Sequence, residues 1–371
     1  MTPARTKVLV DAVVMATAIT GATIGGMAFG PLLPAGDADP RAFILPALAA
    51  AILVGGLAMV RRTGMRRWFL PLWTLAGATF SVLLLTGVAA GRWPVMGAHA
   101  LPDAPRVSLA VFSALDLEEA GQGALPVLQQ RFAIRRLDVV TAAALADQPR
   151  VLLAQPRLMT PQELVDLDAW TRRGGAMLIL ADPLLLWPPD GTAAAPMPGD
   201  RTGPPLTSLL DPLLTHWGLR LEPASDEAMT RRFVGDWLLR LAGASRFVIQ
   251  ASPFADCDTE ADGLMAVCAV GRGHVRLIAD ADLLDARLWQ ADDGRLASDA
   301  IRLVDHWLRA PSAPPPPGNM RMWVRGEADV RNGLRMALLF GIVWAILGAA
   351  MLWRRDYPGK AGTDNDAKQR T

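Results

Sequence analysis

Apolar residues follow two different patterns along the 371-residue chain, long continuous blocks and short interrupted runs. The continuous blocks are Val8–Phe29, Phe43–Val60, Trp68–Ala90 and Met336–Trp353, and only Asp11 in the first block is charged. Each is about as long as a helix that crosses a hydrocarbon core of roughly 30 Å, at 1.5 Å per residue. The pattern therefore predicts four transmembrane helices and a lipid bilayer as their surroundings.

The first block also admits a second interpretation. Arg5 and Lys7 precede it, as positive charges precede the apolar region of a cleaved signal peptide. The block is long for such a region, and two further apolar blocks follow at once. These features favour an uncleaved span, and cleavage stays an open alternative.

Positive charge between and beside the blocks predicts their orientation. The loop between the second and third blocks reads RRTGMRR, and Arg354 and Arg355 follow the last block. Because loops rich in Lys and Arg stay on the cytoplasmic side, both termini and the RRTGMRR loop are expected inside the cell. The region between the third and fourth blocks is then expected outside the inner membrane of a bacterium, in the periplasm.

This orientation gives a five-part organisation. We predict a membrane anchor of three transmembrane helices (1–92), a periplasmic α/β domain (93–310), a Pro-rich stalk with a juxtamembrane segment (311–333), a fourth transmembrane helix (334–355) and a cytoplasmic tail (356–371). The stalk prediction rests on the run APSAPPPPGN, because consecutive prolines favour an extended polyproline helix.

Short apolar runs alternate with helical spacing between the third and fourth blocks. The runs that predict strands are Arg106–Leu115, Ile134–Val140, Val151–Ala154, Ala176–Ala181 and Phe247–Gln250, with a hairpin formed by Leu264–Val270 and His274–Ala279. The segments that predict helices are Leu125–Arg131, Thr160–Arg172, Leu206–Trp217, Phe233–Leu241 and a last helix capped by Ser298. Crossovers too long for hairpins indicate a parallel sheet with helices on both faces.

The segment Thr160–Pro183 shows this α/β alternation most clearly. Thr160 suits a helix N-cap, and Glu163 three residues later completes a capping box. Gly174 ends the helix, because glycine adopts the left-handed conformation at low cost. The apolar run Ala176–Ala181 then predicts a strand buried on both faces.

Charge and cysteine content narrow the class of protein. The formal net charge of +1 excludes a global electrostatic attraction for nucleic acid, and the mean hydropathy of +0.25 is high for a soluble enzyme. Cys257 and Cys268 are the only cysteines, eleven residues apart, which is wrong for a CxxC redox or zinc pair. In an oxidising compartment they are expected to form a disulfide, with two free thiols as the alternative.

Three acids are the candidate site. Asp182 follows one predicted strand, and Asp280 and Asp282 follow another. If these strands are parallel neighbours, the acids lie together along one sheet edge and could bind a ligand, a partner or a divalent cation. The simpler alternative is that Asp182 opens an Asp-Pro turn and that Asp280 or Asp282 caps a helix. No spacing typical of a cofactor, a metal centre or a nucleophilic triad occurs, so no cofactor is predicted.

Two separated motifs resemble a known family. The stretch QPRLMTPQELVDLDAWTRRGGAMLILADP (Gln155–Pro183) and the stretch GRGHVRLIADADLLD (Gly271–Asp285), followed by a helix ending in HWL, resemble the auxiliary subunits of gliding-motility ABC transporters (GldG type). The resemblance implies a periplasmic, flavodoxin-like domain of the class I glutamine-amidotransferase type. It also implies an ABC permease and an ATPase as partners.

Enzymes that share the implied fold carry a cysteine nucleophile just after a central strand. Asp182 stands at the corresponding strand end and no cysteine is near, so amidotransferase chemistry is expected to be absent. The family usually has one N-terminal span, whereas three are predicted here. The sequence therefore predicts a non-enzymatic auxiliary membrane subunit of an ABC-type transport system. A membrane-anchored, metal-dependent hydrolase and a structural envelope protein stay as alternatives.

Overall fold

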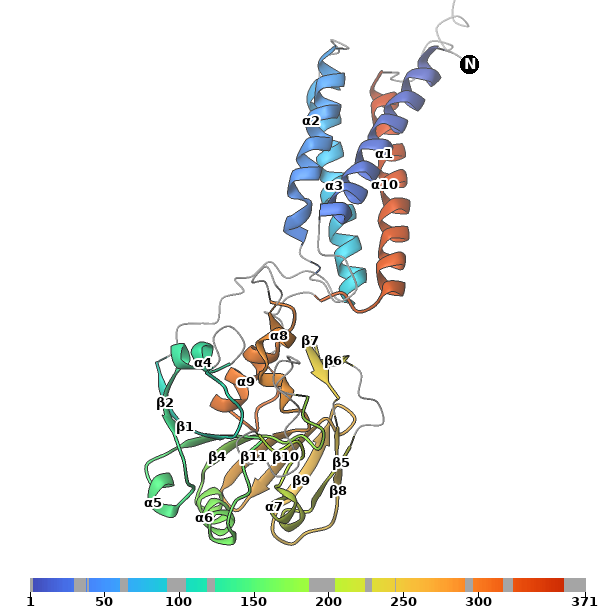
Figure 1. Ribbon diagram of the computed structural model, residues 1–371. Coiled ribbons are helices and arrows are strands. Elements are labelled where there is room, and N and C mark those ends of the chain that lie inside the picture. The colour runs from blue at the N-terminus through green and yellow to red at the C-terminus, as the bar shows by residue number, and fades with distance from the viewer. Residues whose placement is uncertain are drawn as a thin grey trace, which may run out of the picture. The chain divides into compact units, whose positions relative to one another are not determined.

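The computed structural model describes residues 3–29, 38, 40–60, 66–91, 105–118, 124–186, 204–223, 229–243, 245–290, 296–315 and 323–356. The chain divides into two compact units (Figure 1). Met1–His99 and Asn319–Thr371 form the first, called here the membrane unit, and Ala100–Gly318 forms the second, called the α/β domain. Each unit is described by itself.

The described part of the membrane unit consists of helices α1 (Pro3–Phe29), α2 (Ile44–Val60), α3 (Arg66–Ala90) and α10 (Glu327–Asp356), with a short 3-10 turn, η1 (Pro40–Phe43), before α2. Within the described residues, three of these helices are long and apolar enough to span a membrane, namely α1, α3 and α10. The prediction of four long spans is therefore wrong for α2. Its 17 residues measure about 26 Å, because η1 takes up the start of the second apolar block.

Helices α3 and α10 are joined by two tryptophans that each lie over a glycine of the other helix. The Trp73 Nε1–H donates to the Trp344 carbonyl oxygen at 3.0 Å, and the Trp344 Nε1–H donates to the Trp73 carbonyl oxygen at 2.9 Å. A Cβ at Gly77 would lie 2.4 Å from Trp344, and a Cβ at Gly348 would lie 2.3 Å from Trp73. Glycine at these two positions is what lets the rings pack, a use of small residues common in membrane helices.

The α/β domain is built on a seven-stranded sheet in the order β2-β1-β3-β4-β11-β10-β9 (Figure 1). Its strands are β1 (Val107–Ser113), β2 (Phe132–Arg136), β3 (Arg150–Ala154), β4 (Ala176–Leu180), β9 (Asp256–Glu260), β10 (Met265–Val270) and β11 (Gly273–Ile278). Strands β2, β1, β3, β4 and β11 run parallel, and β10 is antiparallel to both of its neighbours. The predicted α/β class with a mostly parallel sheet is confirmed.

Helices and two small sheets surround this sheet. The helices are α4 (Leu125–Arg131), α5 (Ala142–Leu145), α6 (Pro161–Arg172), α7 (Asp211–His216), η2 (Asp282–Leu284), α8 (Ala286–Trp289) and α9 (Ala300–Arg309). The small antiparallel sheets pair β5 (Leu219–Glu222) with β8 (Arg246–Ile249), and β6 (Met229–Val234) with β7 (Trp237–Ala242).

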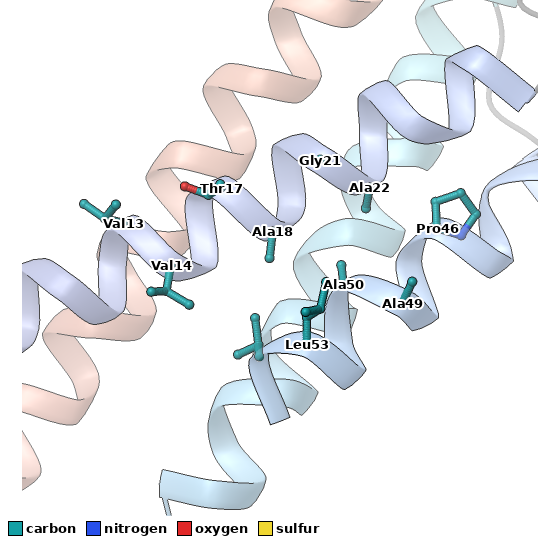
Figure 2. A pocket seen from close by; sticks show the side chains of 11 residues that line it. Val13, Val14, Thr17, Ala18, Gly21, Ala22, Pro46, Ala49, Ala50 and Leu53 are labelled. Carbon is teal, nitrogen blue, oxygen red and sulfur yellow. The ribbon is translucent and has the colours of Figure 1, made fainter. Parts of the chain in front are cut away.

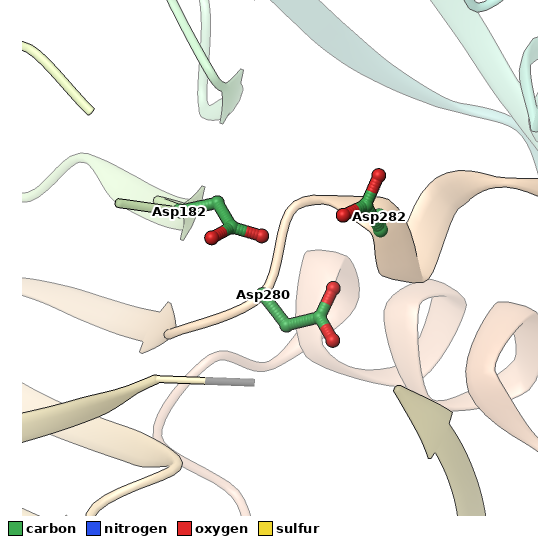
Figure 3. Close-up of side chains that lie close together, drawn as sticks. All are labelled: Asp182, Asp280 and Asp282. Carbon is green, nitrogen blue, oxygen red and sulfur yellow. The ribbon is translucent and has the colours of Figure 1, made fainter. Parts of the chain in front are cut away.

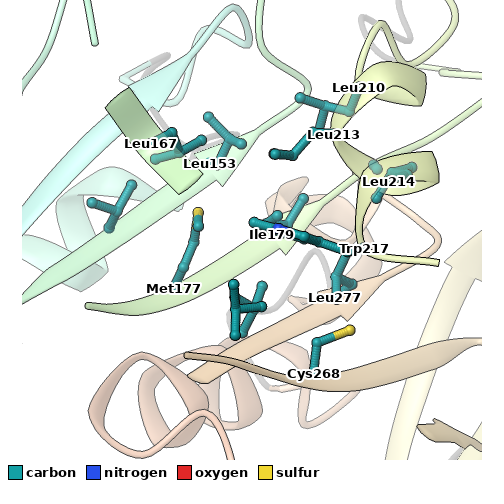
Figure 4. Close-up of a cluster of buried hydrophobic side chains, with 14 of the residues drawn as sticks. Leu153, Leu167, Met177, Ile179, Leu210, Leu213, Leu214, Trp217, Cys268 and Leu277 are labelled. Carbon is teal, nitrogen blue, oxygen red and sulfur yellow. The ribbon is translucent and has the colours of Figure 1, made fainter. Parts of the chain in front are cut away.

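The two faces of the sheet are covered by different helices. On one face Leu167 of α6 and Leu213 of α7 belong to the same buried cluster as Ile179 and Leu277 (Figure 4). On the other face the side chain of Arg276 lies against Trp307 of α9. Residues 276 and 277 point to opposite faces because side chains alternate along a strand. Helices therefore cover both faces, as predicted.

Helix α6 begins as the sequence predicts. Thr160 Oγ1 accepts the Glu163 N–H at 3.2 Å, and a Glu163 carboxylate oxygen accepts the Thr160 N–H at 2.8 Å, which completes the capping box. Burial by itself would raise the pKa of Glu163. Hydrogen bonds from Arg157 and from the N–H groups of Thr160 and Val140 outweigh burial and lower this pKa to about 2. The start of α6 is thus held by a carboxylate that stays ionised.

Two smaller predictions need correction, and two strands were missed. Phe233–Leu241 is not a helix but the β6–β7 hairpin, which turns at Gly235 with φ +60°. Strands β5 and β9 were not predicted. The last helix has Asp299 and not Ser298 at its N-cap position, although Ser298 Oγ accepts the Ala300 N–H at 3.4 Å.

Residues 187–203, between β4 and α7, lie outside the described residues, as does the end of the Pro-rich segment. Within the described residues, the Pro-rich segment does not begin as an extended stalk. Pro311 is buried against the domain, and its carbonyl oxygen accepts a hydrogen bond from Arg276.

Candidate functional site

The three acids singled out in the sequence meet at the carboxyl edge of the sheet. Strands β4 and β11 are parallel neighbours with Leu180 opposite Ile278, so Asp182 and Asp280 each follow at the same distance from a strand end. One carboxylate oxygen from each of Asp182, Asp280 and Asp282 lies within 4.8 Å of the others (Figure 3). All three side chains are buried, although carboxylates are rarely buried without partners.

Backbone amides supply those partners. Asp182 accepts the N–H groups of Leu184 at 2.8 Å and of Ala281 at 3.3 Å. Asp280 accepts the N–H groups of Ala242 at 3.0 Å and of Leu283 at 2.9 Å. Asp282 accepts the N–H of Leu186 at 2.9 Å.

These bonds connect chain segments that are distant in sequence. Asp182, after β4, accepts an N–H from the segment after β11, and Asp282, after β11, accepts an N–H from the segment after β4. Asp280 accepts an N–H from the end of β7. The acidic cluster, defined here as Asp182, Asp280 and Asp282, therefore fixes the loops at the carboxyl edge.

Burial and mutual repulsion change the acidity of this cluster. Burial raises the pKa of Asp182 to about 6, against the lowering effect of the two N–H groups that it accepts. Burial also raises the pKa of Asp280 well above its usual value, and the charges of Asp182 and Asp282 raise it further. Like charges in a shared site favour retention of a proton. These effects favour the protonated forms of Asp182 and Asp280.

Gln155, at the end of β3, belongs to the same edge and was not predicted. Its backbone has φ +38°, in the left-handed region that residues other than glycine rarely adopt. Its side-chain amide accepts the Asp182 N–H and donates to the Asp182 carbonyl oxygen, both at 2.9 Å, and it also donates to the Pro205 carbonyl oxygen at 2.9 Å. Strained residues persist where neighbours over-determine them, and they gather at functional edges.

One sequence signal could have indicated Gln155. A polar residue follows directly after the apolar strand Arg150–Ala154 and stands before a proline, at the carboxyl end of a strand where α/β proteins place functional groups. No pattern in the sequence, however, pairs residue 155 with residue 182.

The chemistry of this carboxyl edge favours hydrogen bonds that hold the loops and recognise a ligand or partner. Carboxylate oxygens are the ligands that Ca²⁺ and Mg²⁺ prefer. Here, however, backbone N–H groups already point at each carboxylate, and burial favours the protonated form of Asp182 and Asp280. The donor set is therefore suited to hydrogen bonding within the protein more than to a cation.

The predicted cysteine pair lies on the antiparallel side of the sheet. Cys257 of β9 and Cys268 of β10 stand directly opposite each other in the ladder, and a disulfide joins them. The bond links an edge strand of the sheet, β9, to its neighbour β10.

The membrane unit has an apolar groove of its own. It lies between α1 and α2 and has a volume of about 530 Å³ (Figure 2). Its walls are made of small and aliphatic side chains: Val13, Val14, Thr17, Ala18, Gly21, Ala22, Pro46, Ala49, Ala50, Leu53 and Val54. A Cβ built at Gly21 meets nothing within 4 Å, so the groove is open at this position.

The structure thus defines a class: an α/β domain with a mostly parallel sheet, inserted between apolar helices long enough to span a membrane. Residues 96–229, 134 of the 371, match the model of an ABC-transporter auxiliary family described as "ABC-type uncharacterized transport system". The matched region runs through β1, β3 and β4 and includes Asp182. The family match connects this part of the chain with ABC-type transport systems.

Other comparisons give distant similarities. No curated protein matches the sequence. The Exo-beta-1,4-mannosidase Op5Man5 from Opitutaceae bacterium strain TAV5 is 14% identical with a TM-score of 0.32, and the match covers 68% of this chain but only 40% of the mannosidase. The cytoplasmic protein STM3548 from Salmonella typhimurium is 11% identical with a TM-score of 0.33, over 54% of this chain and 97% of that one. With TM-scores below 0.5, neither similarity bears on function.

Proposed function

We propose that the chain is a non-enzymatic auxiliary subunit of an ABC-type transport system, anchored in the bacterial inner membrane beside a permease and an ATPase. The observation that carries this proposal is the family match over residues 96–229, in a domain flanked by apolar helices. In this proposal the α/β domain faces the periplasm and recognises a ligand or a partner protein.

The periplasmic orientation requires α2 to cross the membrane as well. With only α1 and α3 crossing before it, the domain would return to the side of the N-terminus. Helix α2 continues directly from η1, and the two together measure about 34 Å, at roughly 1.5 Å per residue for the helix and 2.0 Å for the 3-10 turn. This length is enough for a core of roughly 30 Å. The disulfide between Cys257 and Cys268 also supports an oxidising compartment.

The recognition role rests on the carboxyl edge of the sheet. The parallel strands follow the order β2-β1-β3-β4-β11, which is the flavodoxin-like order and supports the predicted amidotransferase-like fold. In such sheets ligands bind outside the carboxyl ends of the strands. At that edge the described residues offer the strained Gln155 and the acidic cluster. Both cysteines form the disulfide between β9 and β10, away from this edge, which supports the absence of cysteine-based catalysis.

Orientation is tested by labelling single introduced cysteines in intact cells with a membrane-impermeant maleimide. Ser312→Cys, in the α/β domain, is expected to react from outside, and Thr63→Cys, in the RRTGMRR loop, only after permeabilisation. The native cysteines serve as an internal control because a disulfide does not react with maleimide. The opposite labelling pattern, which follows either if α2 does not cross or if the whole bundle is inverted, would end the periplasmic proposal.

Partnership is tested by purification of the tagged full chain from native membranes in mild detergent, followed by mass spectrometry. We expect a permease and an ATPase to co-purify. Recovery of the chain alone, under conditions that keep known transporter complexes intact, would contradict the proposal. Metal analysis of the same sample separates the alternative of a metal-dependent hydrolase, which requires a stoichiometric divalent cation that is lost in Asp280→Asn.

A further inference from the structure

Arg276 is an arginine in the middle of β11 whose side chain is completely buried. Its guanidinium lies 4.8 Å from the ring centre of Trp307 on α9. One of its nitrogens donates to Glu260 Oε2 at 2.6 Å. A buried charge needs such partners, because transfer from water is costly unless the charge is paired and hydrogen-bonded.

Besides a long contact with the Met265 sulfur at 3.9 Å, the other partners of Arg276 come from residues 310–315, called here the strap, which open the Pro-rich connector after α9. The Nε–H of Arg276 donates to the Pro311 carbonyl oxygen at 2.7 Å, and Nη2 donates to the Ala313 carbonyl oxygen at 3.5 Å. The His306 ring contacts the Pro314 carbonyl oxygen at 3.0 Å. The strap also makes one turn of its own, from the Ala313 N–H to the Ala310 carbonyl oxygen at 3.0 Å.

The strap lacks the repeated backbone hydrogen bonds of a helix or a strand. It belongs to no helix or strand, and five of the six positions carry Pro or Ala. Its carbonyl oxygens solvate a charge that originates in the sheet. If the strap leaves, water can take the place of these carbonyl oxygens, while Glu260 and Trp307 keep their contacts with Arg276. Glu260 is 40% exposed, so the ion pair already reaches solvent. Detachment therefore need not disturb the strands.

We propose that residues 310–315 are a detachable strap, docked on Arg276, that sets the free length of the connector between the α/β domain and α10. In the docked state the connector starts at residue 316. In the released state it starts six residues earlier and gains about 19 Å of reach, at roughly 3.1 Å per residue for a Pro-rich chain. The strap is thus a built-in adjustment between the domain and the transmembrane helix that follows it.

The test follows the mobility of a nitroxide label at Ser312→Cys in the full chain, purified in detergent without reductant. Ser312 is exposed, so the label does not replace a buried contact. We expect an immobile component from the docked state and a minor mobile component from the released state. Arg276→Met, which removes both strap hydrogen bonds and keeps an unbranched apolar side chain, is expected to convert the spectrum to the mobile component.

The matched control is Arg272→Met on the same hairpin. Arg272 is exposed, and its side chain donates to the Arg173 carbonyl oxygen, away from the strap, so the spectrum is expected to stay that of the parent. A second variant covers the case in which Arg276→Met does not fold. His306→Ala removes the contact with Pro314 from a partly exposed position and is expected to increase the ratio of mobile to immobile label about fivefold, the shift that loss of one hydrogen bond gives.

The proposal fails if Arg276→Met keeps a cooperative thermal transition and the label at residue 312 stays as immobile as in the control. It also fails if His306→Ala leaves the ratio of the two components unchanged. Neither readout depends on a transport partner, so the strap and the proposed auxiliary function can be refuted separately.

Discussion

The two units of this protein keep their segments together by different means. In the membrane unit, α3 and α10 fit by shape, with a tryptophan of each helix over a glycine of the other. In the α/β domain, buried carboxylates hold segments together by accepting backbone N–H groups. In lipid, apolar burial gives helices no driving force to associate, so close packing must do so. In water, burial of apolar side chains against the sheet already drives folding. Buried polar groups can then fix the positions of the loops.

The largest effect is expected where the domain loses its hydrogen-bond acceptors. Asp280→Ala leaves the N–H groups of Ala242 and Leu283 buried without a partner, which costs about 2–4 kcal/mol in the free energy of unfolding. The control is Asp258→Ala on β9, where the side chain is exposed and the expected change is within about 0.5 kcal/mol. Denaturant titration of the purified chain, followed by circular dichroism, measures both. Equal small effects would show that the acidic cluster does not hold the loops.

The next effect is a dependence of domain stability on pH. Because the folded pKa of Asp182, about 6, exceeds its ordinary value of 3.8, the folded state binds more protons than the unfolded state between these values. The stabilisation is therefore full below about pH 4 and is lost as the pH rises to about 6. The change from Asp182 is on the order of 3 kcal/mol, and the raised pKa of Asp280 adds a loss of the same sign.

Glu163 changes the stability of the domain in the opposite direction, because its pKa is lowered from 4.5 to about 2. Its stabilisation is lost as the pH falls, and only below about pH 4.5. Melting temperatures between pH 4.5 and pH 7 therefore isolate the acidic cluster. We expect the melting temperature to fall over this range and the fall to be smaller in Asp182→Asn. A melting temperature that rises with pH over this range would overturn the assignment of proton uptake to the cluster.

A smaller effect is expected when the shape complementarity in the membrane unit is broken. Gly77→Leu places side-chain atoms where Trp344 lies, and overpacking of this kind costs about 1–3 kcal/mol. Gly21→Leu is the matched control, because nothing lies within 4 Å of a Cβ at that position. Thermal unfolding in detergent should separate the two variants. If both lose the same stability, glycine in this unit serves helix flexibility and not fit.

The smallest effect tests the local start of α6. Thr160→Ala removes the acceptor for the Glu163 N–H and is expected to cost about 1 kcal/mol. Thr160→Ser keeps the hydroxyl group and should retain most of the stability. Denaturant titration measures both, and equal losses in the two variants would exclude the cap as the cause.

Local signals in the sequence predicted the parts of the fold that depend on local physics. The capping box at Thr160 and Glu163 and the strand after Gly175 are present. The parallel pairing of β4 with β11, which entered the sequence-based prediction only as a condition, is also present. That pairing brings Asp182 and Asp280 together without any further information. The Phe233–Leu241 segment was predicted wrongly because β7 is buried on both faces. With five apolar residues in six, β7 (WLLRLA) lacks the alternation that identifies a strand, and such a run cannot be told from a buried helix by spacing alone.

Long-range contacts were beyond the sequence. Gln155 acquires its role from its hydrogen bonds with residues 182 and 205, which no local pattern pairs. Arg276 reads as an exposed position of a hairpin strand, yet its guanidinium is enclosed by Glu260, Trp307 and the strap. The length of α2 depended on where η1 ends, and helix boundaries are poorly defined by apolar runs.

The end of α3 and the segment that leads into α10 lie next to each other in the membrane unit. The Arg325 N–H donates to the Ala89 carbonyl oxygen at 2.9 Å, so the chain leaves the membrane unit and re-enters it at adjacent points. The α/β domain is therefore an insertion with neighbouring ends, the arrangement in which one domain can be exchanged for another. A short loop in place of residues 92–322 should leave a helical bundle that still folds, and other domains could be carried on the same bundle.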